Sequence, residues 1–169
     1  QDSHSLVVFS LPTPAVSLSV TSQSAVVSGA TVVLDNQLAV LDSDSLDLVS
    51  AQVSISSGFI TTDTLAVQTV AGIFASYDAS TGVLSLSGVA TLADYQAVLR
   101  SLTYQAGADP TLNTGDTSER TISIVVSDGD NSSAASSIVV TVSAEQSTLF
   151  TVAFVDWDNT VLSTQQVNA

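Results

Sequence analysis

The sequence predicts an all-β fold: a Greek-key β-sandwich with one short helical turn and a C-terminal β-hairpin. Three observations support this class. Val, Ser and Thr are abundant in a chain that is 45% hydrophobic but only 5% aromatic, and β-branched residues favour strands. Apolar and polar residues alternate in many short segments, as in strands with one buried face. Clusters of Gly, Asp, Asn and Ser separate these segments, as turns require.

The first half of the chain is expected to hold short strands joined by polar loops. Residues 1–12 contain an apolar run closed by proline, which predicts an N-terminal strand or arm. Residues 15–21 (AVSLSVT) and 49–55 (VSAQVSI) alternate with the period of a half-buried strand. Residues 25–34 (AVVSGATVVL) predict one strand with a bulge or bend at Gly29.

The middle of the chain predicts a tight turn followed by a short helix. Residues 78–82 (DASTG) form a hairpin turn in which Gly82 takes the position that needs a positive φ. Residues 91–99 are the one good helix candidate, with Thr91 as N-cap and Asp94 at the third helical position. The apolar face of this helix comprises Leu92, Tyr95 and Leu99.

The last third of the chain predicts the end of the sandwich and then a separate hairpin. Two alternating strands, 120–127 and 136–143, flank an acidic turn and close a sandwich that spans 13–144. The composition changes after it, and 145–169 forms a C-terminal extension whose strands alternate around DWDN. A two-stranded hairpin is only marginally stable in water, so it must pack on the sandwich or on another chain.

The charge balance excludes several partners. Sixteen acidic residues face only two basic ones, Arg100 and Arg120, for a net charge of −14. Phosphate binding needs Lys and Arg, so nucleic acid and anionic membrane surfaces are not expected partners. The charge suits contact with divalent cations or high salt, and solubility alone is the simpler alternative. We expect both arginines to form structural ion pairs with nearby Asp residues.

The missing residue types are also informative. With no Cys, the chain has no disulfide framework, thiol nucleophile or Cys-type zinc site. A Cys-free, Asp/Ser/Thr-rich chain fits a secreted protein of the cell surface. The start at Gln1 leads us to expect a processed or excised product, and no stretch approaches the ~18 apolar residues that would favour membrane insertion.

The segment 38–143 resembles the cadherin-like repeat of bacterial surface proteins. The resemblance is carried, in the order of the family, by LAVLDSDSLDLVSAQVSISSGF, YDASTGVLSLSG, LADYQAVLRSLTY and RTISIVVSDG. It implies an Ig/cadherin-like Greek-key sandwich, an extracellular setting, Ca²⁺ dependence and a role in adhesion or surface architecture. Residues 149–167 resemble the opening hairpin of a different family, a β-grasp repeat of bacterial cell-wall surface proteins.

Two acidic motifs are candidate calcium ligands. Asp42 and Asp44 alternate in VLDSDSLD, so on an extended segment they point the same way and can converge on one hard cation. Asp128 and Asp130 lie in SDGDNSS, which lacks the glutamate that an EF-hand needs at its twelfth position. The alternatives are a solvated acidic loop for the first motif and an Asp-Gly type I′ turn for the second. Asn131 also begins an N-glycosylation triplet.

The C-terminal hairpin carries the candidate interface. Trp157 at its tip either anchors a partner or folds back onto its own sandwich. The predicted interface residues are Phe150, Phe154, Asp156, Trp157 and Asp158.

The sequence as a whole predicts a non-enzymatic extracellular structural protein. No nucleophile–base set, phosphate loop or facing carboxylate pair can be argued from the residues. We expect a homo-oligomer or polymer, a subunit of a surface filament or tube linked by β-strand addition and by Ca²⁺. The alternative is a calcium-binding module of a large surface adhesin, with other surface proteins or glycans as partners.

Overall fold

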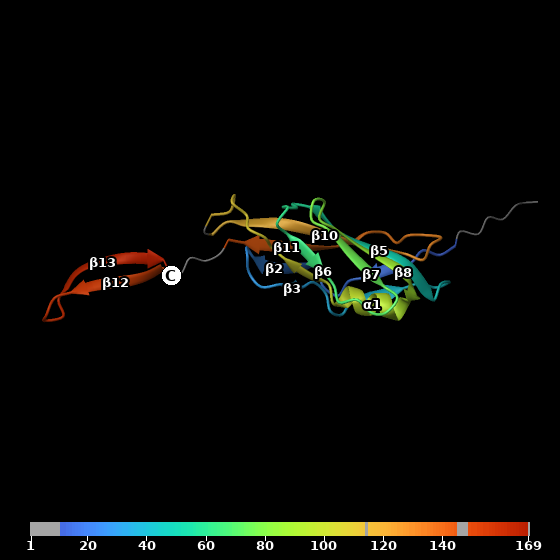
Figure 1. Ribbon diagram of the computed structural model, residues 1–169, viewed down its shortest axis with the longest axis horizontal. Coiled ribbons are helices and arrows are strands. Elements are labelled where there is room, and N and C mark those ends of the chain that lie inside the picture. Colours follow the sequence, from blue (N-terminus) through green and yellow to red (C-terminus); the bar gives the residue numbers. More distant parts are fainter. Residues whose placement is uncertain (1–10, 114, 145–148, 169) are drawn as a thin grey trace, which may run out of the picture.

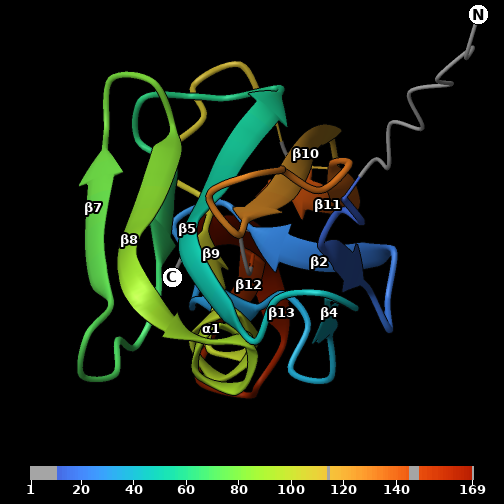
Figure 2. The same cartoon turned by 90° about the vertical axis from the view of Figure 1, so that its right-hand side faces the viewer.

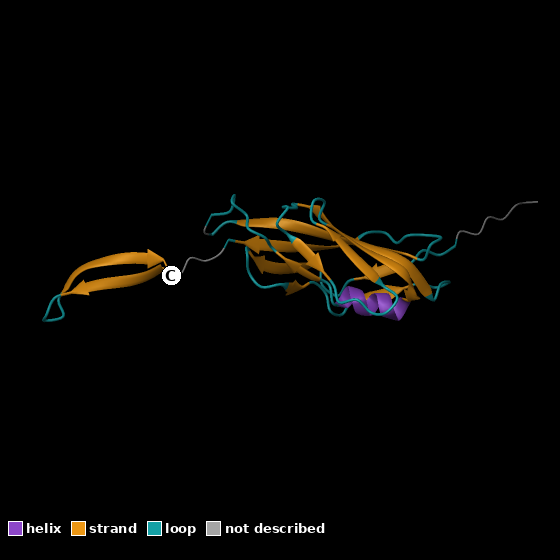
Figure 3. Ribbon diagram, viewed as in Figure 1, coloured by secondary structure: helices purple, strands orange, loops and turns teal. Residues whose placement is uncertain are grey.

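The protein is an all-β sandwich followed by a separate hairpin, which confirms the predicted fold class (Figure 1, Figure 3). The computed structural model describes residues 11–113, 115–144 and 149–168. The N-terminal strand predicted in 1–12 therefore lies almost wholly outside the described residues.

A six-stranded sheet forms one layer of the sandwich. All of its neighbouring strands pair antiparallel except β2 and β11, which run parallel. Strand β7 forms one edge and β2 the other, so within the described part of the chain each edge strand is paired on one side only (Figure 2). The strands, in spatial order, are β2 (Ser22–Val26), β11 (Ser136–Ser143), β10 (Thr117–Ser127), β5 (Asp47–Ser57), β8 (Val83–Thr91) and β7 (Phe74–Asp78).

Shorter elements form the opposite layer. A three-stranded sheet in the order β3-β9-β6 and a two-stranded sheet of β1 and β4 lie there with the helix. The elements are β1 (Ala15–Ser17), β3 (Val32–Val33), β4 (Ala39–Leu41), β6 (Thr64–Ala66), α1 (Leu92–Arg100) and β9 (Thr103–Gln105).

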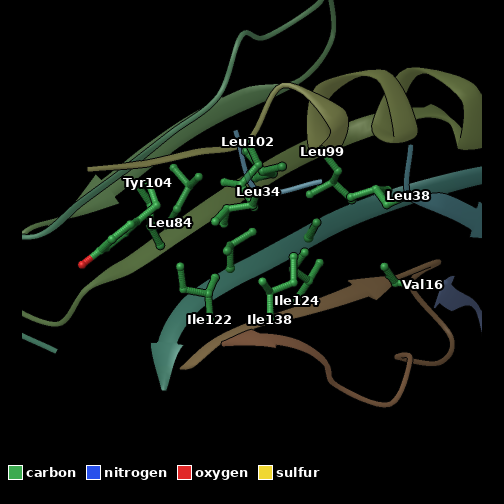
Figure 4. Packing of buried hydrophobic residues seen from close by; sticks show 14 of the residues in the cluster. Val16, Leu34, Leu38, Leu84, Leu99, Leu102, Tyr104, Ile122, Ile124 and Ile138 are labelled. Atoms are coloured by element: carbon green, nitrogen blue, oxygen red, sulfur yellow. The ribbon is translucent and has the colours of Figure 1, made fainter. Parts of the chain in front are cut away.

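The hydrophobic core lies between these layers (Figure 4). In β10 and β11 every second side chain points into the core. The apolar face of the helix packs against the core from the other side. Burying such a side chain is worth about 1.5–3 kcal/mol. Fully buried members include Leu48, Val53, Tyr95, Val98, Leu99, Tyr104, Ile122, Ile124, Val126, Ile138, Val140 and Val142.

The predicted helix and turn are confirmed. The Thr91 hydroxyl accepts a hydrogen bond from the N–H of Asp94 at 3.1 Å, so Thr91 is the N-cap. Gly82 has a φ of +69° and its N–H bonds the carbonyl of Asp78, which closes the turn between β7 and β8.

Two predictions of local structure are wrong. Residues 25–34 do not form one strand with a bulge, because the N–H of Gly29 bonds the Val26 carbonyl and the chain bends there in a turn that separates β2 from β3. Strands β2 and β3 lie in different sheets, so this turn carries the chain from one layer to the other. The Asp-Gly turn is not type I′ either, since only Gly129 has a positive φ there.

The C-terminal hairpin consists of β12 (Leu149–Val155) and β13 (Val161–Asn168). These strands pair only with each other among the described elements. In Figure 1 the hairpin lies beyond the end of the sandwich, apart from both of its layers.

Candidate functional sites

Three acidic residues from two loops meet at one end of the sandwich. Asp42 and Asp44 lie in the loop between β4 and β5, and Asp128 directly follows β10. One carboxylate oxygen from each of the three lies within 4.8 Å of the others. The sequence grouped Asp42 with Asp44 but gave no reason to join Asp128 to them, because that contact depends on the topology.

The fourth predicted ligand serves a different purpose. Asp130 is exposed and does not belong to the group of three. Its N–H donates to a carboxylate oxygen of Asp128 at 2.8 Å, and the N–H of Asn131 donates to the same oxygen at 2.6 Å. The turn therefore fixes the direction of the Asp128 carboxylate and leaves its second oxygen available for a cation.

The electrostatics of the pair Asp42–Asp44 favour a cation. Burial raises the pKa of Asp42, but hydrogen bonds from Asp44 and neighbouring N–H groups outweigh it and hold the pKa below its ordinary value. The Asp42 carboxylate raises the pKa of Asp44 by hydrogen bonding and, with Asp128, by charge repulsion. Oδ2 of Asp42 is buried and has no hydrogen-bond partner. Hard oxygen ligands of this kind suit Ca²⁺, so the residues fit the expected metal.

A second charged cluster is buried in the sandwich around Arg120, whose structural ion pair was expected but whose partners were not identified from the sequence. Nε of Arg120 lies 2.8 Å from Asp63, and Nη2 lies 3.2 Å from Asp109. Asp63 also accepts hydrogen bonds from the N–H groups of Ile60 and Gly107. Because every charged group of the cluster is at least nine-tenths buried and hydrogen-bonded, the cluster is a structural pin rather than a ligand site.

The predicted ion pairs are thus half confirmed. Arg120 pairs with two aspartates, while Arg100 donates from Nε to the carbonyl of Leu38 at 2.8 Å. No salt bridge of Arg100 occurs among residues 11–113, 115–144 and 149–168. Sequence reasoning could not find either partner set, because Arg120 and Asp63 are 57 positions apart.

The hairpin exposes apolar side chains on a two-stranded ladder. Trp157 is 95% exposed, Phe154 51% and Val152 39%. Trp157 therefore does not fold back onto its own sandwich. The backbone of Phe150 pairs with Val167, and its side chain lies outside what the structure describes.

The two acids of the hairpin tip shape the turn. Oδ1 of Asp156 accepts the N–H groups of Asp158 and Thr160, and Oδ1 of Asp158 accepts the Thr160 hydroxyl. The hydrogen bonds with Asp156 and Thr160 lower the pKa of Asp158. These bonds hold Trp157 at the apex, and a direct role of either acid in an interface stays a prediction.

The acidic cluster and the hairpin lie at opposite ends of the sandwich. Asp128 follows the end of β10, where β11 begins in antiparallel register, and the hairpin follows the far end of β11. The N-terminal side of the described chain is beside the cluster, since the side chain of Asn131 donates to the carbonyl of Pro12 at 3.4 Å. A copy or module joined at one end is thus far from one joined at the other.

Comparison with known proteins gives one partial match. No family model matches the chain. Over 90 residues it is 40% identical to Halomucin from Haloquadratum walsbyi, a match that covers 50% of this chain and 1% of Halomucin. The chain therefore spans a very small part of the relative that it matches. None of the described helices is both long and apolar enough to cross a membrane.

Proposed function

We propose that this protein is a non-enzymatic structural subunit of the extracellular surface that assembles through its C-terminal hairpin. The observation that carries the proposal is the hairpin itself, which exposes Val152 and Phe154 on β12 and Trp157 in the turn, and whose strands pair with no other described strand. An isolated hairpin is marginal in water, so a neighbouring chain is the natural source of the missing contacts. The partial similarity to Halomucin supports a place at the cell surface.

Calcium is the second part of the proposal. Asp42, Asp44 and Asp128 would bind Ca²⁺ together with carbonyl or water oxygens, and the ion would tie the β4–β5 loop to the end of β10. It would also reduce repulsion between copies that each carry a net charge of −14. The resemblance to cadherin-like repeats supports this choice of ion.

The direct test is electron microscopy of the purified chain in about 1 mM Ca²⁺, the range in which extracellular modules bind, and then in excess chelator. Filaments or tubes that form in calcium and disperse in chelator are expected. A chain truncated after Ala144 should stay monomeric while its sandwich melts at an unchanged temperature. Single particles of the full chain under both conditions would contradict assembly.

A variant separates the calcium effect from general screening. D128N removes one ligand charge of the cluster, and D116N removes an equal charge from an exposed loop outside it. D128N should raise the calcium concentration needed for assembly, and D116N should leave it unchanged. Equal shifts in both variants would show that calcium acts only by screening.

A second function is favoured by the extent of the Halomucin match. Ninety residues aligned to 1% of a long protein fit one module within a large surface adhesin. The opposite positions of the cluster and the hairpin also suit modules joined end to end, with calcium at the joint. A truncated chain that remains monomeric and keeps its ligand binding, beside a full chain that never polymerises, would favour this function.

A further inference from the structure

The edge strand β7 is an incomplete part of the sandwich. It pairs with β8 on one side, and no other strand of the described residues pairs with its second side (Figure 2). Phe74, its first residue, is 72% exposed, and Val89 on the adjoining strand is 71% exposed. Val89 lies two positions from Ser87, the register partner of Phe74, so both apolar side chains are at the same end of this edge. An unpaired edge with exposed apolar residues invites another strand.

Electrostatics restricts which surfaces of two copies can meet. With sixteen acidic residues per chain, most contacts would bring like charges together. Strand β7 has no charge before its last residue, Asp78, and β12 and β13 have none at all. The free edge and the two hairpin strands thus carry almost no charge, and the two acids of the hairpin lie at its tip.

Chain length prevents the hairpin from reaching this edge in its own molecule. Ala144 is fixed at the end of β11, where its N–H bonds the carbonyl of Asp116. A strand added beyond β7 lies five strand spacings from β11, about 24 Å. The chain from Ala144 to Leu149 spans at most roughly 17 Å when fully extended. A hairpin strand beside β7 must therefore come from a second copy.

We infer that the hairpin of one copy adds a strand to the β7 edge of the next copy and covers Phe74 and Val89. This inference rests on the proposed assembly and names its donor and its acceptor. The donor and acceptor surfaces differ, so the contact is heterologous and continues into an open polymer. The opposite edge, β2, is the competing acceptor, but its exposed residues are Ser22, Ser24 and Val26. Val26 is only 42% exposed, so β2 offers one smaller apolar contact where the β7 edge offers Phe74 and Val89.

Engineered cysteines test the assignment, because the natural chain has none. One preparation carries S76C in β7, and a second carries A153C in β12 or T164C in β13. Mixing them with a short thiol-to-thiol cross-linker should give a covalent dimer of one chain of each kind. S24C in β2 is the matched control for the other edge, and it should give little product.

A substitution gives an independent readout. F74D places a charge on the proposed acceptor, and V33D places the same charge on an exposed apolar residue of β3 in the other layer. Both should keep the thermal transition of the sandwich, while F74D lowers the amount of polymer at least tenfold and V33D does not.

The outcomes separate the two proposals. Polymers that persist in F74D and cross-link through S24C would overturn the β7 assignment and leave assembly standing. The absence of polymer in the natural chain, together with the absence of every cross-linked product in the cysteine variants, would overturn assembly as well. Selective cross-linking through S76C together with loss of polymer in F74D supports the inference.

Discussion

The sandwich and the hairpin are both built from paired, alternating strands, but they differ in whether the apolar side chains are buried. In the sandwich, alternating strands enclose a core, and even its buried charges on Arg120, Asp63 and Asp109 have partners. In the hairpin, a similar alternation leaves Phe154 and Trp157 in solvent. Alternation alone therefore does not decide burial, because a second layer is needed to cover the apolar face. The sandwich encloses its core within one chain, whereas we propose that a partner chain covers the hairpin.

The largest loss of stability is expected when the buried, positively charged side chain of Arg120 is removed from the sandwich. R120A leaves Asp63 and Asp109 as unpaired buried charges, and we expect a loss of about 3–5 kcal/mol in the free energy of unfolding. Urea denaturation measures it. R100A removes one hydrogen bond to a carbonyl and should cost about 1 kcal/mol. Equal losses in the two variants would show that the buried cluster is not a special support of the fold.

Low pH should reduce the free energy of unfolding of the sandwich by protonating Asp109 of the Arg120 cluster. The Thr111 hydroxyl lowers the pKa of Asp109 below its ordinary value of 3.8, against the effect of burial and with added contributions from the Thr111 N–H and Arg120. The resulting stabilisation is complete above pH 3.8 and is lost as the pH falls through the lowered folded value. Urea midpoints measured from neutral pH down to about 2 should fall less steeply in D109N than in the natural chain.

The cluster of Asp42, Asp44 and Asp128 is intermediate between the sandwich core and the hairpin. Its residues come from one chain, but we expect a bound cation to balance their charges. A raised pKa means that ionised Asp44 weakens the metal-free fold as the pH rises, so D44N should raise the melting temperature in chelator. D42N should lower it, because the pKa of Asp42 is held down in the folded state. Both variants should lose the increase in melting temperature that calcium gives the natural chain. A calcium response preserved in both would rule out this site.

The smallest effect on stability is expected in the hairpin. W157S and F154S remove exposed side chains, so the unfolding free energy of the sandwich should change by less than about 0.5 kcal/mol. The same variants should reduce assembly measured by sedimentation. Destabilisation of the monomeric sandwich by either variant would show that the hairpin packs on its own chain, and the comparison would fail.

Local signals in the sequence predicted much of the fold. The helix cap at Thr91, the turn glycine at 82 and the strands of 120–127 and 136–143 each depend on neighbouring residues, and the structure confirms them. The prediction of one strand over 25–34 was wrong because a glycine fits either a bulge in a strand or a turn between layers, and the residue with the positive φ in this turn is Ser28. Only the position of the next strand, far away in the chain, distinguishes them.

The candidate sites depended more on long-range geometry. Asp42 and Asp44 could be paired from their spacing, but Asp128 joins them only because β10 ends beside the β4–β5 loop. A structural ion pair of Arg120 was expected, but nothing in the sequence identifies Asp63 as its partner, because the two residues are 57 positions apart. Alternation predicted the hairpin strands. The exposure of their apolar side chains became visible only in the structure, where no described element covers the hairpin.

The parallel pairing of β2 with β11 has a mechanical consequence. These strands are the N-terminal and C-terminal members of the large sheet, and they pair from Val139 with Ser22 to Ser143 with Val26. Because the chain leaves the sandwich at opposite ends, a pull along its long axis draws the two strands past each other. The ladder is then loaded in shear, so its hydrogen bonds resist together instead of opening one after another. A unit built in this way bears tension along the direction in which its own hairpin extends.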